Sequence, residues 1–116
     1  MTSYLLFIYN GPYTHERSYT ALRFAYTALV NDHNVKIFFF EDGIYNAKKN
    51  QNPVNIYNIN EWLLKCLNEK KCQIAACGVC MKTKGMNESE LLERINVGTM
   101  ELALQWTEES DKIISF

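Results

Sequence analysis

The chain has 116 residues, 47% of them hydrophobic, and carries a formal net charge of −1 at pH 7. This length suits one domain with a real core and is too short for two, so we expect a single domain over residues 1–116. The balanced charge argues against a protein that binds nucleic acid directly. No apolar run is long enough to cross a bilayer, and the first ten residues lack the basic start of a signal peptide. We therefore expect a cytoplasmic protein that does not contact membranes.

The first part of the chain predicts two strands with a helix between them. The apolar and aromatic run Tyr4 to Tyr9 is typical of a buried strand. Thr14 can cap a helix that runs to about Asn31. Val35 to Phe40 predicts the second strand. The apolar residues of the helix that recur at helical spacing are Tyr19, Leu22, Tyr26 and Leu29.

The middle of the chain predicts a helical segment, an amphipathic helix and a third strand. One or two helical turns are expected within residues 44–52. The next helix spans residues 59–67, and Asn58 and Glu61 are spaced as a capping pair at its start. The small apolar residues of Gln73 to Cys77 indicate a strand that is buried on both faces.

The last part of the chain predicts two further helices and two further strands. Asn87 and Glu90 repeat the capping spacing, so a short helix is expected from there to Ile95, with a brief strand over residues 95–97. The next helix, over residues 100–108, is apolar around most of its circumference, and we expect it to be well buried. Residues 112–116 predict a final strand inside the sheet.

Strand-like and helix-like segments alternate along the whole chain, and no hairpin signal joins two strands. This pattern is typical of a three-layer α/β/α fold, in which helices cover both faces of a mostly parallel sheet of about five strands. In such a sheet all strand-to-helix loops leave at the same edge, which is where reactive and ligand sites lie. The loops after residues 9, 40, 77 and 97 should share that edge.

The stretch Gln73 to Gly85 is the most informative for function because it places two thiols at this edge. Cys77 ends the predicted third strand, and Gly78 after it permits a sharp turn into a helix. Cys80 follows three residues after Cys77. Free backbone N–H groups and the positive end of a helix dipole favour a thiolate at the Cys77 position. In a reducing compartment, clustered cysteines indicate redox, sulfur or metal chemistry more often than disulfides.

These segments together resemble the DsrE/TusD-like family, also described as DsrE/DsrF-like sulfur-relay proteins. The resemblance rests on the first strand and its loop, on Phe38 to Ala47, and on Cys77 followed eight residues later by Gly85. The Gly98-Thr99-Met100 helix start and the closing strand also match, so the resemblance covers nearly the whole chain. It implies a flavodoxin-like, DsrEFH-like fold.

The resemblance also implies a function for Cys77. In this family the matching cysteine carries sulfur as a persulfide, and members assemble as homotrimers, homohexamers or heterohexamers. We therefore expect a sulfurtransferase that passes sulfane sulfur through Cys77 from a donor protein to an acceptor protein, as a homotrimer or homohexamer. Some members have no cysteine at the position of Cys80, so its part in the chemistry stays open: it could attack a Cys77 persulfide or simply pack in the helix.

Other residues at the edge are candidates for supporting roles. Lys82 and Lys84 could provide a positive field for Cys77 if the chain folds back. Asp42 could orient a loop or a partner, although capping the next helix is the simpler interpretation. Thr14 lies at the same edge. His15, His33, Cys66 and Cys72 are more simply explained as solvated or structural residues.

Three other functions are consistent with parts of the sequence. Cys77 and Cys80 could form the redox pair of a dithiol-disulfide oxidoreductase, although they follow the third strand rather than an early one. The chain could also be a non-catalytic subunit that only builds an oligomer. A zinc site would require Cys66 and Cys72 to join the pair, and the loop after the first strand lacks a phosphate-binding sequence, so we expect no metal and no flavin or other cofactor.

Overall fold

The fold is built on one five-stranded sheet in a computed structural model that describes residues 1–54 and 57–116. All four strand pairings are parallel, and the strand order is β4-β3-β2-β1-β5. This confirms the predicted parallel sheet. The strands are β1 Ser3–Ile8, β2 Asn34–Phe39, β3 Cys72–Cys77, β4 Asn96–Gly98 and β5 Lys112–Ser115.

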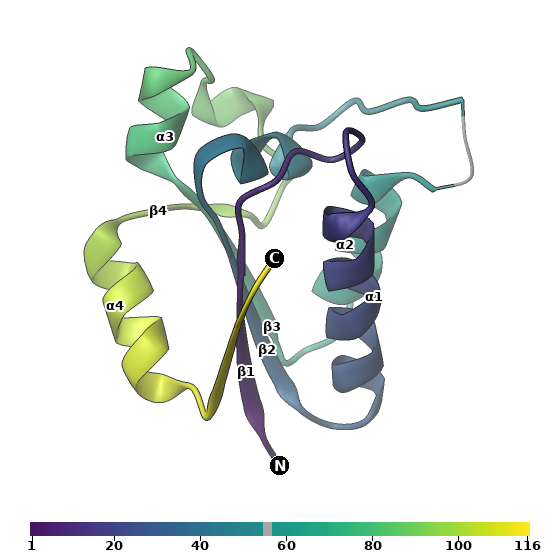
Figure 1. The fold of residues 1–116 in the computed structure, drawn as a ribbon, viewed down its shortest axis with the longest axis vertical. Coiled ribbons are helices and arrows are strands. Elements are labelled where there is room, and N and C mark those ends of the chain that lie inside the picture. Colours follow the sequence, from purple (N-terminus) through teal and green to yellow (C-terminus); the bar gives the residue numbers. More distant parts are fainter. Residues whose placement is uncertain (55–56) are drawn as a thin grey trace.

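Helices cover both faces of the sheet, as the alternation of elements predicts (Figure 1). Helices α1 and α2 lie against one face, and α4 lies against the other. Helix α3 and the 3₁₀ helices η1 and η2 gather beyond the carboxyl ends of the strands. The helices are α1 Arg17–Val30, η1 Glu41–Ala47, α2 Ile59–Leu67, α3 Gly78–Thr83, η2 Glu88–Glu90 and α4 Met100–Glu109.

Helix α1 packs closely on the sheet because small residues line its inner face. Ala21, Leu22 and Ala25 are fully buried there. The helix begins later than predicted, with Glu16 rather than Thr14 at its N-cap. The loop before it is held by tertiary hydrogen bonds, since the Ile59 N–H donates to the hydroxyl of Tyr13 at 3.1 Å. These contacts keep the chain out of helical geometry until Arg17.

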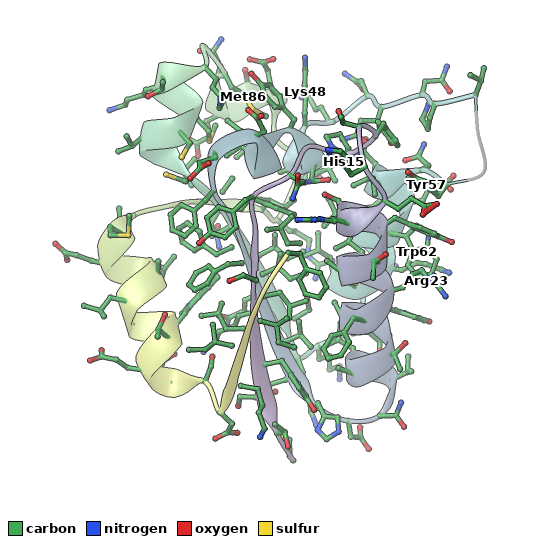
Figure 2. The ribbon with its side chains drawn as sticks, viewed as in Figure 1. His15, Arg23, Lys48, Tyr57, Trp62 and Met86 are labelled. Atoms are coloured by element: carbon green, nitrogen blue, oxygen red, sulfur yellow. The ribbon has the colours of Figure 1, made fainter. Side chains whose placement is uncertain are left out.

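Aromatic side chains cover the outer side of α1 and α2. The rings of Tyr19 and Tyr57 stack with centroids 4.2 Å apart, and Trp62 meets Tyr19 edge-on at 5.6 Å. Figure 2 shows Tyr57 and Trp62 close to Arg23, whose guanidinium lies over the Tyr19 ring. This cluster packs Tyr57, which lies just before α2, onto the two helices.

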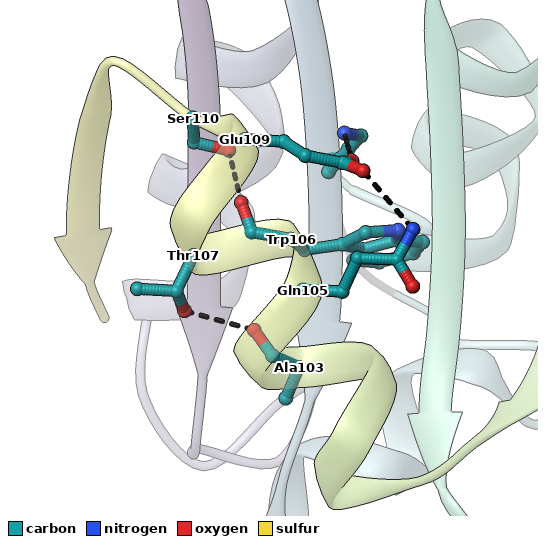
Figure 3. Close-up of polar contacts among 7 residues, drawn as sticks. Ala103, Gln105, Trp106, Thr107, Glu109 and Ser110 are labelled. Carbon is teal, nitrogen blue, oxygen red and sulfur yellow. Dashed lines mark hydrogen bonds and ion pairs between the residues drawn. The ribbon is translucent and has the colours of Figure 1, made fainter.

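Helix α4 is more exposed than the sequence suggests, so the prediction of a well-buried helix is wrong. Only Ala103 and Trp106 are buried, whereas Met100 is 69% and Leu104 is 60% exposed. The reason is that α4 lies alone along its face of the sheet in the described part of the chain (Figure 1). Polar contacts at its C-terminal end supplement this packing, among them the Glu109 contacts in Figure 3.

The prediction of a helix from Asn87 to Ile95 is also wrong beyond the first turn. The capping box between Asn87 and Glu90 is present, but the helix ends at Glu90 and Leu91 is extended. Backbone hydrogen bonds to the end of η1 and to the residues after it replace the expected helical ones: Leu92 N–H donates to Ala47 O at 2.9 Å, and Lys49 N–H donates to Glu90 O at 2.8 Å. Tertiary pairing therefore outcompetes local helix propensity here.

The final strand lies at the edge of the sheet rather than in its interior. β5 pairs only with β1 among the described strands, and Ile113 is 45% exposed. The buried core lies on both faces of the sheet: most of it is formed with α1 and α2, and Ala103 and Trp106 of α4 belong to it on the other face. Across residues 1–54 and 57–116, none of the helices combines the length and apolar character needed to span a bilayer.

Candidate functional site

Cys77 is the last residue of β3 and the N-cap of α3. Its Sγ accepts a hydrogen bond from the backbone N–H of Cys80 at 3.3 Å. A cap of this kind satisfies a backbone donor that the helix cannot pair internally. The predicted position of Cys77 at the carboxyl edge of the sheet is confirmed. Its side chain is not freely exposed, however, because only 7% of Cys77 is accessible.

The Cys77 side chain points to the α4 side of the sheet. Gly98 of β4 pairs with Cys77, and a Cβ on Gly98 would lie 3.2 Å from that of Ala75 and 2.7 Å from the Phe38 ring. Phe38 in turn contacts Trp106 of α4. Since side chains two residues apart share a face of a strand, Cys77 lies on the same face as Ala75.

Cys80 lies on the first turn of α3 and is partly exposed. Its Sγ accepts a hydrogen bond from the backbone N–H of Glu41 at 3.1 Å. Burial raises the pKa of the Cys80 thiol, and hydrogen bonding with the Cys77 side chain raises it further. The Glu41 N–H acts in the opposite direction because it stabilises the thiolate. The two thiols therefore lie side by side in different surroundings.

Glu41 reaches Cys80 because η1 turns sharply after β2. Glu41 has a φ of 53°, a left-handed conformation that is uncommon for residues with a side chain. Gly43 makes the turn possible, since a Cβ there would lie 2.0 Å from the carbonyl oxygen of Ile8. A strained residue next to a reactive group is often functional.

An ion pair joins η1 to α3 beside the cysteines. The Lys84 Nζ lies 2.8 Å from a carboxylate oxygen of Asp42, and this contact raises the pKa of Lys84. Asp42 pairs with Lys84 and does not cap η1, whose N-cap is Phe40. Lys82 lies apart from this ion pair. It lines a cavity of about 480 Å³ together with Gly78 and other residues of α3, β4 and α4.

Gly78 is needed for close packing rather than for an unusual turn. Its φ is not positive, because among the described glycines only Gly85 has a φ in the left-handed region. A Cβ on Gly78 would lie 2.9 Å from a methyl group of Val97. Gly78 thus allows α3 to begin directly over β4.

Thr14 belongs to a separate, polar cavity at the same edge. This cavity has a volume of about 350 Å³, and His15 and Asp42 also line it. Asp42 is therefore shared between the cavity and the Lys84 ion pair. The structure brings Cys77, Cys80, Gly78, Asp42 and Lys84 together and leaves Thr14 and Lys82 on the flanks.

An aromatic groove lies next to the cysteines on the α4 side. It has a volume of about 590 Å³, and Phe40 and Tyr9 stack within it with ring centroids 5.7 Å apart. Glu41 also lines the groove, so the residue that contacts Cys80 borders the groove as well. Met100 and Leu104 of α4 form the opposite wall.

The remaining cysteines and His33 have structural surroundings. Cys66 and Cys72 are buried, and burial raises the pKa of Cys66 to about 12 and raises that of Cys72 as well. Cys72 is at the start of β3, the end opposite Cys77. His33 accepts a hydrogen bond from the Thr2 N–H at 3.0 Å. No group of three potential metal ligands occurs within the described residues.

Sequence reasoning missed the parts of the site contributed by the residues directly after β1 and β2. The loop that begins at Glu41 is predicted to lie at the reactive edge, but the sequence predicts no contact between Glu41 and Cys80, and it predicts Tyr9 and Phe40 only as strand residues. The acidic pair before Gly43 was visible, but nothing in the sequence indicates a left-handed φ at Glu41. The aromatic residues at the strand ends were a usable signal for the groove.

Several relatives are similar to the chain along almost its whole length. The uncharacterized protein MK0008 of Methanopyrus kandleri is 45% identical over 109 residues, which cover 94% of this chain and 89% of MK0008. The uncharacterized protein MJ0989 of Methanocaldococcus jannaschii is 41% identical over 113 residues, which cover 97% of this chain and 98% of MJ0989. YchN of Escherichia coli K12 is 26% identical over 115 residues and is covered to 97%, as is this chain.

Solved structures share the fold. The crystal structure of YchN from E. coli superposes with a TM-score of 0.93 at 23% identity and covers all of both chains. MTH1491 from Methanobacterium thermoautotrophicum has a TM-score of 0.75 at 15% identity, and the match covers 98% of this chain and 99% of MTH1491. The model of the DsrE/DsrF-like family matches residues 2–116. With 45% identity to one relative and this match over the chain, the protein belongs to the DsrE/DsrF-like family.

Proposed function

We propose that the protein is a persulfide carrier, a sulfurtransferase in which Cys77 holds sulfane sulfur between a donor protein and an acceptor protein. The observation that carries this proposal is the placement of Cys77. Its Sγ lies at the carboxyl edge of a parallel sheet and accepts a backbone N–H, with a second thiol beside it. Membership of a family generally linked to sulfur relay supports the same chemistry.

The chemistry requires a thiolate that can accept and release one sulfur atom. The Cys77 thiolate attacks the outer sulfur of a donor persulfide, the donor's S–S bond breaks, and the donor leaves as a thiolate. An acceptor thiolate then attacks the outer sulfur of the Cys77 persulfide and restores the Cys77 thiolate. The Cys80 N–H at 3.3 Å stabilises negative charge on Cys77 Sγ before loading and after release.

The partners proposed for this reaction are proteins, and the protein itself is proposed to form a homotrimer or homohexamer. Exposed apolar side chains near the site support such contacts. Val79, Met100 and Leu104 are each at least 60% exposed, and contiguous exposed apolar surface typically marks an interaction site. A reducing compartment such as the cytoplasm would keep the cysteines as thiols.

A dithiol-disulfide oxidoreductase is the second candidate function. It is favoured by one observation, the contact between the two cysteines, in which the Cys80 backbone N–H donates to Cys77 Sγ at 3.3 Å. Neighbouring thiols of this kind can form a disulfide after a modest adjustment. The two functions differ in outcome, because a carrier gains the mass of sulfur and an oxidoreductase loses two hydrogens.

Mass spectrometry separates these candidates. The protein is incubated with a cysteine desulfurase and cysteine, and the modified residue is located by peptide mapping. We expect a gain of one sulfur atom that is removed by reductant and maps to Cys77. A Cys66→Ala variant serves as control and should load equally. If the wild type gains no sulfur but forms a reversible Cys77–Cys80 disulfide, the carrier proposal is wrong and the oxidoreductase is supported.

A further inference from the structure

The two thiols of the site differ in how easily a second protein can reach them. Cys77 is only 7% exposed, whereas Cys80 is partly exposed and its neighbour Val79 is 74% exposed. Transfer of a sulfur atom requires the reacting atoms to approach to roughly 3–3.5 Å. A cysteine presented by a folded partner meets Cys80 at the surface before it can reach Cys77.

Contacts between the two cysteines allow sulfur to pass from one to the other. The Cys80 backbone N–H donates to Cys77 Sγ at 3.3 Å, so the two cysteines are in direct contact. They are therefore neighbours without any rearrangement of α3.

Building on the proposed carrier function, we propose that Cys80 exchanges sulfur with partner proteins and that Cys77 is the shielded position where the sulfur is held. In the first step the Cys80 thiolate attacks the outer sulfur of the partner's persulfide. The partner's S–S bond breaks, and the partner leaves as a thiolate. Cys80 then carries the persulfide.

The second step moves the same sulfur inward. The Cys77 thiolate attacks the outer sulfur of the Cys80 persulfide, the S–S bond to Cys80 breaks, and its electron pair stays on Cys80 Sγ. The sulfur keeps its oxidation state, so no oxidant or reductant is needed. Delivery to an acceptor is the reverse sequence, from Cys77 to Cys80 and then to the acceptor thiol.

Glu41 has a defined part in this exchange. Its backbone N–H points at Cys80 Sγ from 3.1 Å, so it stabilises the thiolate that departs when sulfur moves to Cys77. The raised pKa of Cys80 then favours uptake of a proton by that thiolate. Burial of Cys77 shields the held sulfur from other thiols.

The test compares a small donor with a protein donor. Loading rates from glutathione persulfide and from a cysteine desulfurase with cysteine are followed by intact mass and peptide mapping. The Cys80→Ser variant should load Cys77 from glutathione persulfide within threefold of the wild-type rate, but at least tenfold more slowly from the desulfurase. The Cys77→Ser variant should take up sulfur on Cys80 from both donors. Thr83→Ala, on the same helix, is the matched control and should behave as wild type.

Three outcomes would overturn this division of roles while leaving the carrier function intact. These are desulfurase loading of Cys80→Ser within twofold of wild type, no sulfur on Cys80 in Cys77→Ser, or release of sulfide with formation of a Cys77–Cys80 disulfide after loading. If the wild type takes sulfur from neither donor, the carrier function itself fails.

A measurement on the wild type does not depend on how well the variants fold. Iodoacetamide and a bulky maleimide are added in separate time courses, and the modified cysteines are mapped. We expect the maleimide to label Cys80 but not Cys77, and iodoacetamide to label Cys80 first. Labelling of Cys77 by the maleimide before Cys80 would contradict the proposal.

Discussion

Cys77 and Cys80 are three residues apart, yet each thiol depends on a different backbone N–H group. The N–H near Cys77 belongs to α3 itself, whereas the N–H near Cys80 comes from η1. The hydrogen bond to Cys77 Sγ therefore depends only on the formation of α3. The hydrogen bond to Cys80 Sγ depends on how η1 packs against α3.

The pH dependence of Cys80 reactivity follows from its surroundings. Because burial and the Cys77 side chain raise its pKa above the ordinary value of 9.0, Cys80 is mostly protonated at neutral pH. Its thiolate fraction, and hence its alkylation rate, should still rise as pH increases beyond 9. A mapped iodoacetamide profile between pH 7 and pH 11 measures this.

The Glu41→Gln variant isolates one contribution to that profile. The Glu41 carboxylate raises the pKa of Cys80 by charge repulsion, whereas its N–H is retained in the variant. The profile should therefore move to lower pH. Glu101→Gln removes another carboxylate from the groove and is the control. An unchanged or upward-shifted profile in Glu41→Gln would show that the carboxylate has no such effect.

Among the elements, η1 matters most to the site although it is a short 3₁₀ helix. It contributes the Glu41 N–H and the Asp42 carboxylate, and it packs against the end of β1 through Gly43. Its position depends on the absence of a side chain at one residue. Displacing η1 should therefore affect stability and the cysteine pair together.

A Gly43→Ala substitution tests this dependence. The added Cβ would lie 2.0 Å from the Ile8 carbonyl oxygen, so η1 must move. Overpacking of this kind costs about 1–3 kcal/mol of unfolding free energy, and loss of the Glu41 contact should also change Cys80 alkylation. Urea denaturation and the alkylation profile measure the two effects. Gly11→Ala is the control, because its nearest contact would be an ordinary 3.7 Å; equal stability of both variants would refute the argument.

Elements with strong local signals were predictable from the sequence, and elements set by tertiary contacts were not. The Asn58 side chain caps α2 as predicted, and the small apolar run of β3 correctly placed Cys77 at the edge of the sheet. The segment after Asn87 has an equally good capping signal, but pairing with the chain after η1 ends its helix early. The η1 turn and the Glu41 contact depend on the meeting of η1, β1 and α3, which no single segment encodes.

At the scale of the whole molecule, two helices cover one face of the sheet and one helix covers the other. The α1–α2 side has two helices and an aromatic cluster over them, whereas the other side has α4 with exposed Met100 and Leu104 (Figure 1). The groove beside α4 adjoins Glu41. A subunit interface on this side would lie close to the cysteine pair.

Leu104→Glu should disrupt the proposed homo-oligomer if the α4 side forms the interface. Leu104 is 60% exposed, so a charge there should cost the isolated chain little stability but strongly weaken an apolar interface. Sedimentation velocity should show a shift from trimer or hexamer to monomer. Val30→Glu, at a 52% exposed site at the end of α1, is the control. An identical oligomer in Leu104→Glu would place the interface elsewhere.

The buried thiols make the whole fold sensitive to alkali. The folded-state pKa of Cys66 is about 12, above the ordinary 9.0, so the folded state holds its proton more tightly than the unfolded state. This stabilising contribution is fully present below pH 9 and is lost as pH rises toward 12. One pH unit above the unfolded pKa corresponds to about 1.4 kcal/mol. Urea denaturation at pH 7 and pH 10 should show a smaller loss of stability in Cys66→Ala than in wild type, and equal losses would contradict this.

The pairing of β1 with β5 also has a consequence for biosynthesis. Tyr4 lies opposite Lys112 in the sheet, so this contact joins segments that are far apart in the sequence and are made at different times. Strands β1, β2 and β3 can associate earlier, but one side of β1 stays unpaired until β5 has left the ribosome. An open strand edge is a template for aggregation, and pairings between distant segments form slowly. The nascent chain therefore passes through a stage in which this side of β1 needs protection, and that stage ends when β5 pairs with β1.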